Sequence, residues 1–229
     1  MIDVHSHILH CVDDGSPSLE TSLKLIKESI EQGVTDIILT PHYNRQTNVS
    51  VAEVRERFEE LKTASKEQGL PINLYLGQEV YMSRGVKEEI KDRKPCFIND
   101  GKFILIEFSS TDRCDVAEMV YEIKLLGYKP IVAHFERCHK VTAETAKEIV
   151  EHGGYIQVNA GSLVGDKKKH YIKLVKQLFK MGLVDFIASD VHDSRPNYMA
   201  KAFAYVSKKF GKEIAENVFN NNAKKLLKG

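Results

Sequence analysis

The chain has 229 residues, of which 42% are hydrophobic and 28% charged, a composition typical of an ordered globular protein. Its 33 Lys and Arg residues balance 32 Asp and Glu residues, and a net charge of +1 gives no whole-protein field that favours nucleic acid or a membrane. No apolar stretch approaches the roughly 20 residues of a membrane span, and no N-terminal basic segment precedes an apolar one. We therefore expect a cytoplasmic protein with one domain over residues 1–229 and no membrane insertion.

The cysteines argue against thiol chemistry. They lie far apart and form no C-x-x-C pair, which disfavours a zinc ribbon or a redox motif and indicates reduced thiols. None is followed six positions later by an arginine, the spacing with which cysteine-dependent phosphatases cradle a phosphate around their nucleophile. The four are Cys11, Cys96, Cys114 and Cys138. Any phosphate chemistry in this chain must use another nucleophile.

Apolar runs of strand length alternate with amphipathic helical stretches along the whole chain. This alternation is typical of repeated β-α units around a parallel sheet. The first helical stretch, over residues 18–33, ends at Gly33 and carries apolar residues at three- and four-residue steps. Those residues are Leu19, Leu23, Ile26 and Ile30. Seven strands are predicted, at residues 2–5, 36–42, 73–80, 103–108, 130–134, 155–159 and 185–192.

Polar side chains stand at or just past the C-terminal end of nearly every predicted strand. In a barrel of parallel strands these ends gather at one face, which carries the active site. The side chains are His5, His7, His42, Glu79, Glu107, His134, Asn159, Asp190 and His192. A lone histidine at a strand end is more often structural, but clustered buried carboxylates without a cation would be prohibitively costly. Carboxylate and imidazole donors without thiolates suit Mn, Fe or Zn, so the pattern predicts a metal cluster.

The motifs at these positions resemble those of the PHP (polymerase and histidinol phosphatase) family. They are VHSH at 4–7, TPH at 40–42, GQE at 77–79, IEF at 106–108, AHFER at 133–137 and SDVH at 189–192. The resemblance covers essentially the full chain. Within the family, the chain is most similar to bacterial protein-tyrosine phosphatases encoded with capsule and exopolysaccharide genes. The segments that carry this closer likeness are IDVHSHI at 2–8, DDG at 13–15 and IASDVH at 187–192.

The resemblance implies an α/β fold, a distorted seven-stranded (β/α)7 TIM-like barrel that holds three metal ions. Manganese is the expected metal, and Fe, Zn, Mg and Co are alternatives. The implied ligands are His5, His7, Asp14, His42, Glu79, Glu107, His134, Asp190 and His192, with Glu79 as a bridge. Asp14 is preferred to Asp13 by its match to the family's DDG motif, and Asp13 could instead cap the helix that follows.

Clustered cations would address the resistance of a phosphate monoester to hydrolysis, because they activate water and hold the phosphoryl oxygens in line. Arg137 is the candidate cation for the phosphate, since a guanidinium matches its oxygens bidentately; a surface ion pair is the alternative. His42 and His192 are candidates to protonate the leaving oxygen, but they are also needed as ligands, so no acid is assigned. Many relatives have Pro in place of Phe135, and we expect the rim of the pocket to differ there.

The expected function is a metal-dependent protein-tyrosine phosphatase. The resemblance implies that its partner is the tyrosine-rich C-terminal tail of a bacterial tyrosine kinase that regulates capsule or exopolysaccharide synthesis. Basic residues expected after strand ends could attract such a tail: Arg45, Arg137, Lys140, the run Lys167 to Lys169, and Arg195. A small-molecule phosphatase such as histidinol phosphatase is the alternative enzyme. A non-catalytic PHP binding module is a third hypothesis, disfavoured because every expected ligand position is filled.

Overall fold

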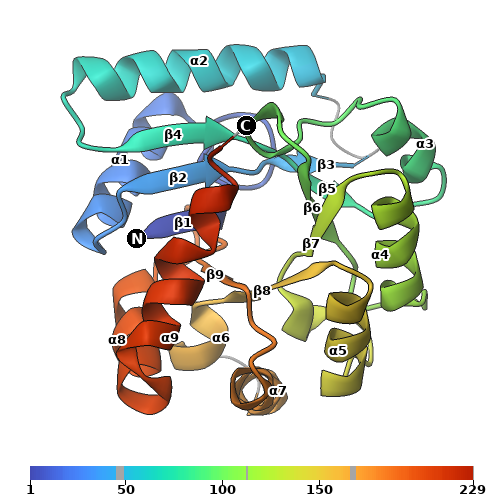
Figure 1. Cartoon of the computed structure of the whole chain (residues 1–229). Coiled ribbons are helices and arrows are strands. Elements are labelled where there is room, and N and C mark those ends of the chain that lie inside the picture. Colours follow the sequence, from blue (N-terminus) through green and yellow to red (C-terminus); the bar gives the residue numbers. More distant parts are fainter. Residues whose placement is uncertain (45–48, 112, 166–168, 229) are drawn as a thin grey trace.

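The structure is a computed structural model that describes residues 1–44, 49–111, 113–165 and 169–228. Its strands run parallel and curl into a barrel-like sheet with helices packed outside (Figure 1). The described strands are β1 (Ile2–Ser6), β2 (Asp36–Leu39), β3 (His42–Tyr43), β4 (Asn73–Leu76), β5 (Glu79–Tyr81), β6 (Phe103–Glu107), β7 (Lys129–Val132), β8 (Tyr155–Asn159) and β9 (Phe186–Ala188). They form two sheets in the orders β1-β2-β4 and β3-β5-β6-β7-β8-β9. The predicted α/β fold with a curled parallel sheet is confirmed.

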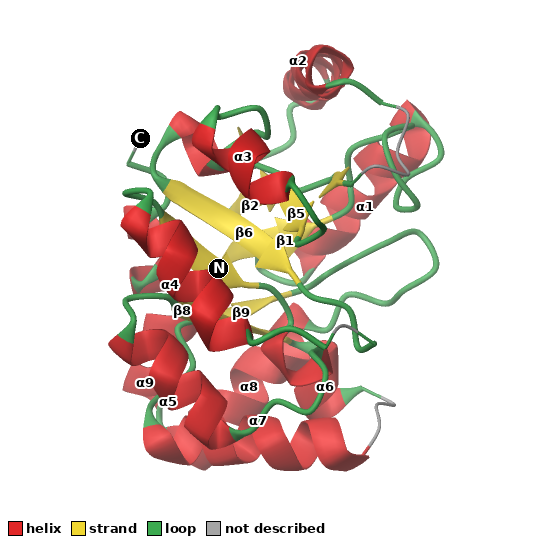
Figure 2. Ribbon diagram, turned by 90° about the vertical axis from the view of Figure 1, so that its right-hand side faces the viewer, coloured by secondary structure: helices red, strands yellow, loops and turns green. Residues whose placement is uncertain are grey.

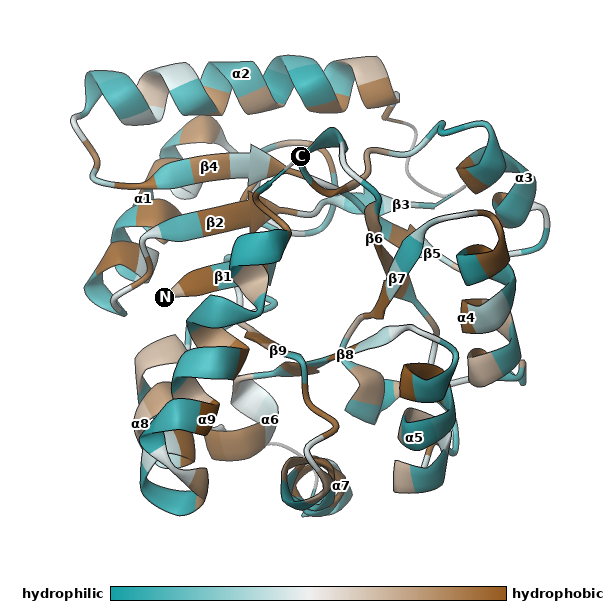
Figure 3. Cartoon of the chain, in the orientation of Figure 1, coloured by the Kyte–Doolittle hydropathy of each residue, from teal (hydrophilic) through white to brown (hydrophobic). Residues whose placement is uncertain are grey.

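The helices cover the outside of this sheet. They are α1 (Leu19–Glu31), α2 (Val51–Glu67), α3 (Val86–Lys91), α4 (Val116–Leu125), α5 (Ala143–Glu151), α6 (Gly161–Val164), α7 (Lys169–Met181), α8 (Met199–Phe210) and α9 (Lys212–Glu216). Shorter helical turns are η1 (Ile98–Asp100), η2 (Phe135–Arg137), η3 (Asn217–Asn221) and η4 (Ala223–Lys225). Hydrophobic segments concentrate in the strands, and hydrophilic segments cover much of the outer helices (Figure 3). In the described part of the chain, no helix is both long and apolar enough to cross a membrane.

The predicted helix over residues 18–33 is confirmed as α1. Ser18 is its N-cap, and the Ser18 hydroxyl accepts a hydrogen bond from the Thr21 N–H at 3.1 Å. Gly33 follows the helix with a φ of +82°, a left-handed conformation that favours glycine. Because Ser18 fills the cap position, the alternative hypothesis that Asp13 caps this helix is wrong.

Two of the seven predicted strands are each interrupted. Residues 36–42 form β2 and β3, and residues 73–80 form β4 and β5. Pro41, between the first pair, has no backbone N–H to donate to a sheet ladder. Gly77 lies between the second pair, and a Cβ there would lie 3.1 Å from the side chain of Ile98, so the small residue lets the backbone pass close by. At both interruptions the chain moves from one sheet to the other.

Side-chain alternation along the strands carries polar groups to one end of the barrel. In β6, Phe103 and Leu105 join the hydrophobic cluster inside the barrel, and Glu107 follows them on the same face. Phe186 of β9 joins the same cluster, and Asp190 lies two residues past the end of that strand. Figure 2 shows long loops on the side to which the β6 arrowhead points. The polar side chains at the strand ends therefore lie at a loop-rich face of the barrel.

The first and last strand segments meet to close the sheet. The His7 N–H donates to the Val191 carbonyl oxygen at 3.0 Å, and the Asp190 N–H donates to the His5 carbonyl oxygen at 3.0 Å. Leu226, near the C-terminus, joins the hydrophobic cluster inside the barrel. Backbone hydrogen bonding therefore sets the HxH pair at the start of the chain beside the SDVH motif near its end.

Candidate metal centre

All nine side chains predicted as metal ligands lie together at one end of the barrel. Their donor atoms form four overlapping groups among the described residues, and the atoms of each group lie within 4.8 Å of one another. The groups are His7, Asp14, His42 and His192; His5, His7 and Asp190; His5, Glu79 and His134; and His42, Glu79 and Glu107. Because the groups share members, ions bound to them would be close neighbours.

Glu79, the first residue of β5, lies at the centre of the cluster. Its Oε1 is 2.8 Å from His134 Nε2 and 3.3 Å from His5 Nε2, and its Oε2 is 3.0 Å from His42 Nδ1 and 3.2 Å from His7 Nε2. The carboxylate is buried, and these short contacts lack the geometry of hydrogen bonds, so neither oxygen is satisfied. An unsatisfied buried carboxylate is costly. Oxygens and imidazole nitrogens that converge in this way fit shared cations.

The charge states of Glu79 and His192 suit metal binding. Burial alone would raise the pKa of Glu79, but attraction to His5 and a contact from His134 outweigh it and hold the pKa well below its usual range. Burial and the neighbouring charge of His7 lower the pKa of His192 to about 4, so this imidazole is neutral at pH 7. Metal ions bind ionised carboxylates and neutral imidazoles. Both side chains are therefore in the form that binds a metal.

Three other imidazoles gain basicity from the same carboxylate. Burial would lower the pKa values of His5, His7 and His42, but neighbouring carboxylates outweigh burial and raise all three. Glu79 is the main cause for His5 and His42, whereas His7 responds to Asp13 first and to Glu79 second. A protonated imidazole has no lone pair for a metal, so metal ions and protons compete for these nitrogens.

The two aspartates of the DDG motif have different environments. The Asp14 side chain is 66% exposed, and its Oδ1 lies 3.5 Å from both His42 Nε2 and His192 Nε2. The Asp13 side chain is buried, and its Oδ2 accepts hydrogen bonds from His7 Nδ1 at 2.7 Å and from the His42 N–H at 3.1 Å. Burial opposes ionisation of Asp13, but these donors lower its pKa to about 2. Asp13 therefore orients His7, a role that sequence analysis missed.

Three backbone positions beside the cluster have special requirements. At Gly15, a Cβ would overlap the carbonyl oxygen of His7, so only glycine fits. His134 has a φ of +29° and Asp190 a φ of +50°, and such values cost a residue with a side chain about 1–3 kcal/mol. The His134 N–H is held by a 2.7 Å hydrogen bond to Gln157 Oε1. Strain of this kind is expected where surrounding contacts fix the direction of a functional side chain.

The carboxylate of Asp190 contacts two arginines, Arg137 and Arg195. Nη1 of Arg137 lies 2.8 Å and Nη1 of Arg195 lies 3.1 Å from Asp190 Oδ2, and Asn159 Nδ2 donates to the same oxygen at 2.7 Å. The other oxygen, Oδ1, lies 3.7 Å from His7 Nε2. Arg137 thus forms an ion pair, but with a carboxylate of the cluster instead of a surface neighbour. Its guanidinium lies at the edge of the candidate metal centre.

Phe135 does not form the rim of the site. Its side chain is fully buried in the outer hydrophobic core, because the helical turn η2 directs it inward while Arg137, two residues on, reaches Asp190. The expected difference between this rim and that of relatives stays a prediction. His42 and His192 each face Asp14 through Nε2, so both lie inside the cluster. A role for either as an acid stays a prediction.

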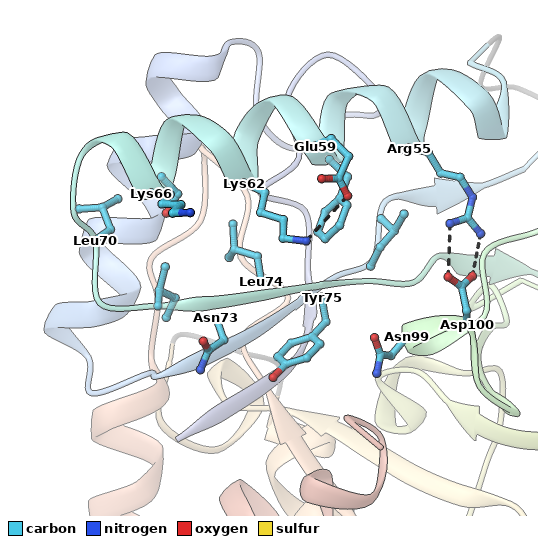
Figure 4. A pocket seen from close by; sticks show the side chains of 14 residues that line it. Arg55, Glu59, Lys62, Lys66, Leu70, Asn73, Leu74, Tyr75, Asn99 and Asp100 are labelled. Atoms are coloured by element: carbon cyan, nitrogen blue, oxygen red, sulfur yellow. Dashed lines mark hydrogen bonds and ion pairs between the residues drawn. The ribbon is translucent and has the colours of Figure 1, made fainter. Parts of the chain in front are cut away.

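A cavity of about 780 Å³ lies away from this cluster, between α2, β4 and η1 (Figure 4). None of the nine predicted ligands lines it. Two of its charged side chains, Arg55 and Asp100, are paired with each other at 2.7 Å. The cavity is therefore separate from the candidate metal centre.

Comparison with known proteins agrees with the geometry of the site. A family model described as capsular polysaccharide synthesis, CpsB/CapC, matches residues 1–228. The tyrosine-protein phosphatase CpsB of Streptococcus agalactiae is 36% identical over 239 residues, which cover 100% of this chain and 98% of that protein. One solved structure comes from work on YwqE of Bacillus subtilis and CpsB of Streptococcus pneumoniae, described as metal-dependent tyrosine phosphatases. It aligns with a TM-score of 0.89 at 31% identity and covers 99% of this chain and 94% of that chain.

A more distant likeness concerns the fold alone. Histidinol phosphate phosphatase of Lactococcus lactis, solved with zinc, L-histidinol and phosphate, aligns with a TM-score of 0.57 at 16% identity and covers 92% of this chain and 93% of that chain. Together with the alignment to the structure from the YwqE and CpsB work, this likeness confirms the predicted PHP-type fold. Because the family model spans nearly the whole sequence, and because relatives above 30% identity match from end to end, the chain belongs to the CpsB/CapC family of capsular polysaccharide synthesis.

Proposed function

We propose that this chain is a metal-dependent tyrosine-protein phosphatase that acts in capsular polysaccharide synthesis. Its family membership supports this function, as do relatives named tyrosine-protein phosphatase or described as metal-dependent tyrosine phosphatases. The observation that carries the proposal is the buried Glu79 carboxylate, whose oxygens face four imidazole nitrogens without hydrogen bonds. This arrangement calls for cations, and closely spaced cations suit the hydrolysis of a phosphate monoester.

The nine clustered side chains are the proposed ligands of three ions. Manganese is the first choice, and the oxygen and imidazole donors would also suit Fe, Zn, Mg or Co. Glu79 belongs to two of the four groups and is the proposed bridge between ions. Asp14 is the most exposed of the carboxylates, which leaves its side of the cluster open to a substrate.

The residues of the chain divide the work of the reaction. When bound, the ions would supply an activated water and neutralise phosphoryl charge. Arg137 contributes a planar cation at the edge of the cluster, where its guanidinium can bind phosphate oxygens. Asp13 keeps His7 turned toward Glu79. Three donors on one oxygen of Asp190 keep its other oxygen turned to the cluster.

The leaving group explains why phosphotyrosine suits this site. A phenol has a pKa of about 10, far below that of an alkyl alcohol, so its departure demands less from a general acid. The site offers no imidazole that is clearly free for this role, since His42 and His192 both belong to the cluster. A phosphotyrosyl ester is therefore easier for this site than a phosphoseryl ester or histidinol phosphate.

The proposed partner is the phosphorylated tail of a bacterial tyrosine kinase that controls capsule or exopolysaccharide synthesis. A mobile acidic tail could present its tyrosines at the open face of the barrel. Basic side chains beyond strand ends support this partner: Arg137 and Lys140 after β7, Arg195 after β9, and the exposed Lys169 at the start of α7. Arg45, Lys167 and Lys168, which were expected to contribute, lie outside the described residues.

A comparison of substrates tests the proposed function. With manganese-loaded protein at one pH, kcat/KM should be highest for a phosphotyrosine peptide, lower for the matched phosphoserine peptide, and lower for histidinol phosphate. A chelator should abolish turnover and manganese should restore it. If histidinol phosphate is preferred by more than about tenfold, near 1.4 kcal/mol in transition-state binding, the small-molecule alternative replaces this proposal.

Thiol modification should leave turnover largely intact. Burial raises the pKa of Cys96 to about 11 and raises the pKa of Cys138 as well, so both stay in the unreactive thiol form at neutral pH. Cys11 and Cys114 are exposed, but neither belongs to the clustered donor groups. Turnover should be measured before and after iodoacetamide treatment, with mass spectrometry to count modified thiols. Complete inactivation by alkylation of one cysteine would point to a thiol nucleophile instead of metal chemistry.

A further inference from the structure

Strand β8 carries two polar side chains into the interior of the barrel. Gln157 and Asn159 stand two residues apart on one face of the strand and are 0% and 5% exposed. The strand lies between β7 and β9, whose extensions carry His134 and Asp190. Neither amide belongs to the clustered donor groups found among the described residues. Buried amides need hydrogen-bond partners, so their contacts indicate what they do.

The two amides connect three of the proposed ligands. Gln157 Oε1 accepts the His134 N–H at 2.7 Å and lies 3.1 Å from His5 Nδ1. Gln157 Nε2 donates to Asn159 Oδ1 at 2.8 Å. Asn159 Nδ2 donates to Asp190 Oδ2 at 2.7 Å. The side chains of β8 thus connect strand β1, which contains His5, with the segments after β7 and β9, which contain His134 and Asp190.

The groups at the two ends of this series of hydrogen bonds determine which atom donates and which accepts in each bond. The His134 N–H can only donate, and the ionised carboxylate of Asp190 can only accept. Gln157 must therefore present its oxygen to His5, and His5 must carry its hydrogen on Nδ1. In the neutral imidazole the lone pair is then on Nε2, and this atom faces Glu79 Oε1 at 3.3 Å. Histidines that bind metals through one nitrogen commonly donate from the other in this way.

We propose that Gln157 is a positioning residue of the metal centre. Its amide oxygen holds His5 in the tautomer that binds through Nε2, and the same oxygen holds the backbone of His134 in its strained conformation. This inference rests on the ligand set proposed above. Loss of the amide oxygen should weaken metal binding through two ligands at once, although Gln157 touches neither metal nor substrate.

Three variants separate positioning from packing. Gln157→Leu fills the space but removes the acceptor. Gln157→Glu keeps an oxygen toward both donors, and its protonated carboxyl can also donate to Asn159 Oδ1, as the Gln157 amide does. Gln78→Leu is the matched control, because Gln78 is 2% exposed and its Oε1 also accepts a backbone N–H, that of Cys96 at 2.8 Å. Titration calorimetry of each metal-stripped variant with Mn²⁺ measures the affinity, and thermal denaturation without metal measures stability.

Gln157→Leu should bind Mn²⁺ about 10–100-fold more weakly than the wild type, the usual effect of removing a partner behind a ligand. Gln157→Glu should recover most of that loss. Gln78→Leu should lower thermal stability without weakening metal binding. Equal Mn²⁺ affinity in Gln157→Leu and wild type would overturn the positioning role. If the wild type itself binds no Mn²⁺, the proposed ligand set fails instead.

A spectroscopic measurement keeps the inference testable if Gln157→Leu does not fold. In wild-type protein loaded with diamagnetic Zn²⁺, nitrogen-15 NMR of the histidine rings should place the hydrogen of His5 on Nδ1. The signal of that hydrogen should be protected from exchange, because its nitrogen is buried against Gln157. A His5 ring with its hydrogen on Nε2 would contradict the assigned tautomer.

Discussion

Replacing Glu79 with glutamine is expected to remove bound metal and turnover together. The carboxylate is shared between two donor groups and lies within 3.3 Å of four imidazole nitrogens, so its charge serves more than one ion. A neutral amide keeps the size of the side chain but removes this charge. Metal ions supply several kcal/mol of transition-state stabilisation, so turnover should fall roughly 10³-fold or more.

Metal content by inductively coupled plasma mass spectrometry and turnover on a phosphotyrosine peptide measure both effects. Glu136→Gln is the matched control, since Glu136 is also buried and its Oε1 accepts the Asn159 N–H at 3.1 Å, which an amide oxygen can replace. Burial raises the pKa of Glu136, so loss of its charge matters less there. Full metal content in Glu79→Gln would show that this residue is no bridge.

The strands and the candidate ligands could be predicted because both depend on local patterns. In the run FILIE, Phe103, Leu105 and Glu107 share one face of a strand, so a polar residue at its end must lie where the barrel opens. Parallel strands bring all such ends to one face, and no knowledge of long-range contacts is needed. The strand interruptions at Pro41 and Gly77 could also have been predicted, because proline and glycine often interrupt strands. They were missed because each residue lies within an apolar run that reads as one continuous strand.

Roles that depend on distant neighbours could not be predicted. Asp13 and Asp14 are adjacent and chemically identical, yet one is buried against His7 and the other is exposed beside His42 and His192. Only the path of the loop between β1 and α1 decides which aspartate faces the cluster directly. Resemblance to the family's DDG motif selected Asp14 as a ligand but gave no role to its neighbour.

The sequence of β8 also contained evidence for a polar interior of the barrel, which the strand prediction did not use. In YIQVN, Gln157 and Asn159 alternate with Ile156 and Val158, which pack in the outer core. Strands of a parallel sheet are usually apolar on both faces. Two polar residues on one face of such a strand therefore indicate a polar interior beside them. Which groups they contact still depends on the register between strands.

Arg137 can be removed without taking the metal centre apart. Its contact with the cluster is one hydrogen bond to Asp190 Oδ2, and that oxygen also accepts from Arg195 at 3.1 Å and from Asn159 at 2.7 Å. Two donors therefore remain to hold the carboxylate after truncation. The Arg137 side chain is 38% exposed, so its loss leaves no large cavity in the core. An effect of truncation on chemistry can thus be separated from an effect on metal binding.

Arg137→Ala should keep its metal ions and lose about 10²–10³-fold in kcat, the effect expected when one preorganised charge is removed from a developing transition state. Arg137→Lys should recover only part of this loss, because an ammonium keeps the charge but cannot form two parallel bonds to a phosphate. Arg55→Ala removes an arginine–carboxylate pair far from the cluster and should leave kcat near wild type. Metal content and kcat measured on the same preparations decide between two roles: metal loss in Arg137→Ala would make this arginine a support for Asp190, whereas full metal content with slow turnover assigns it to the phosphate.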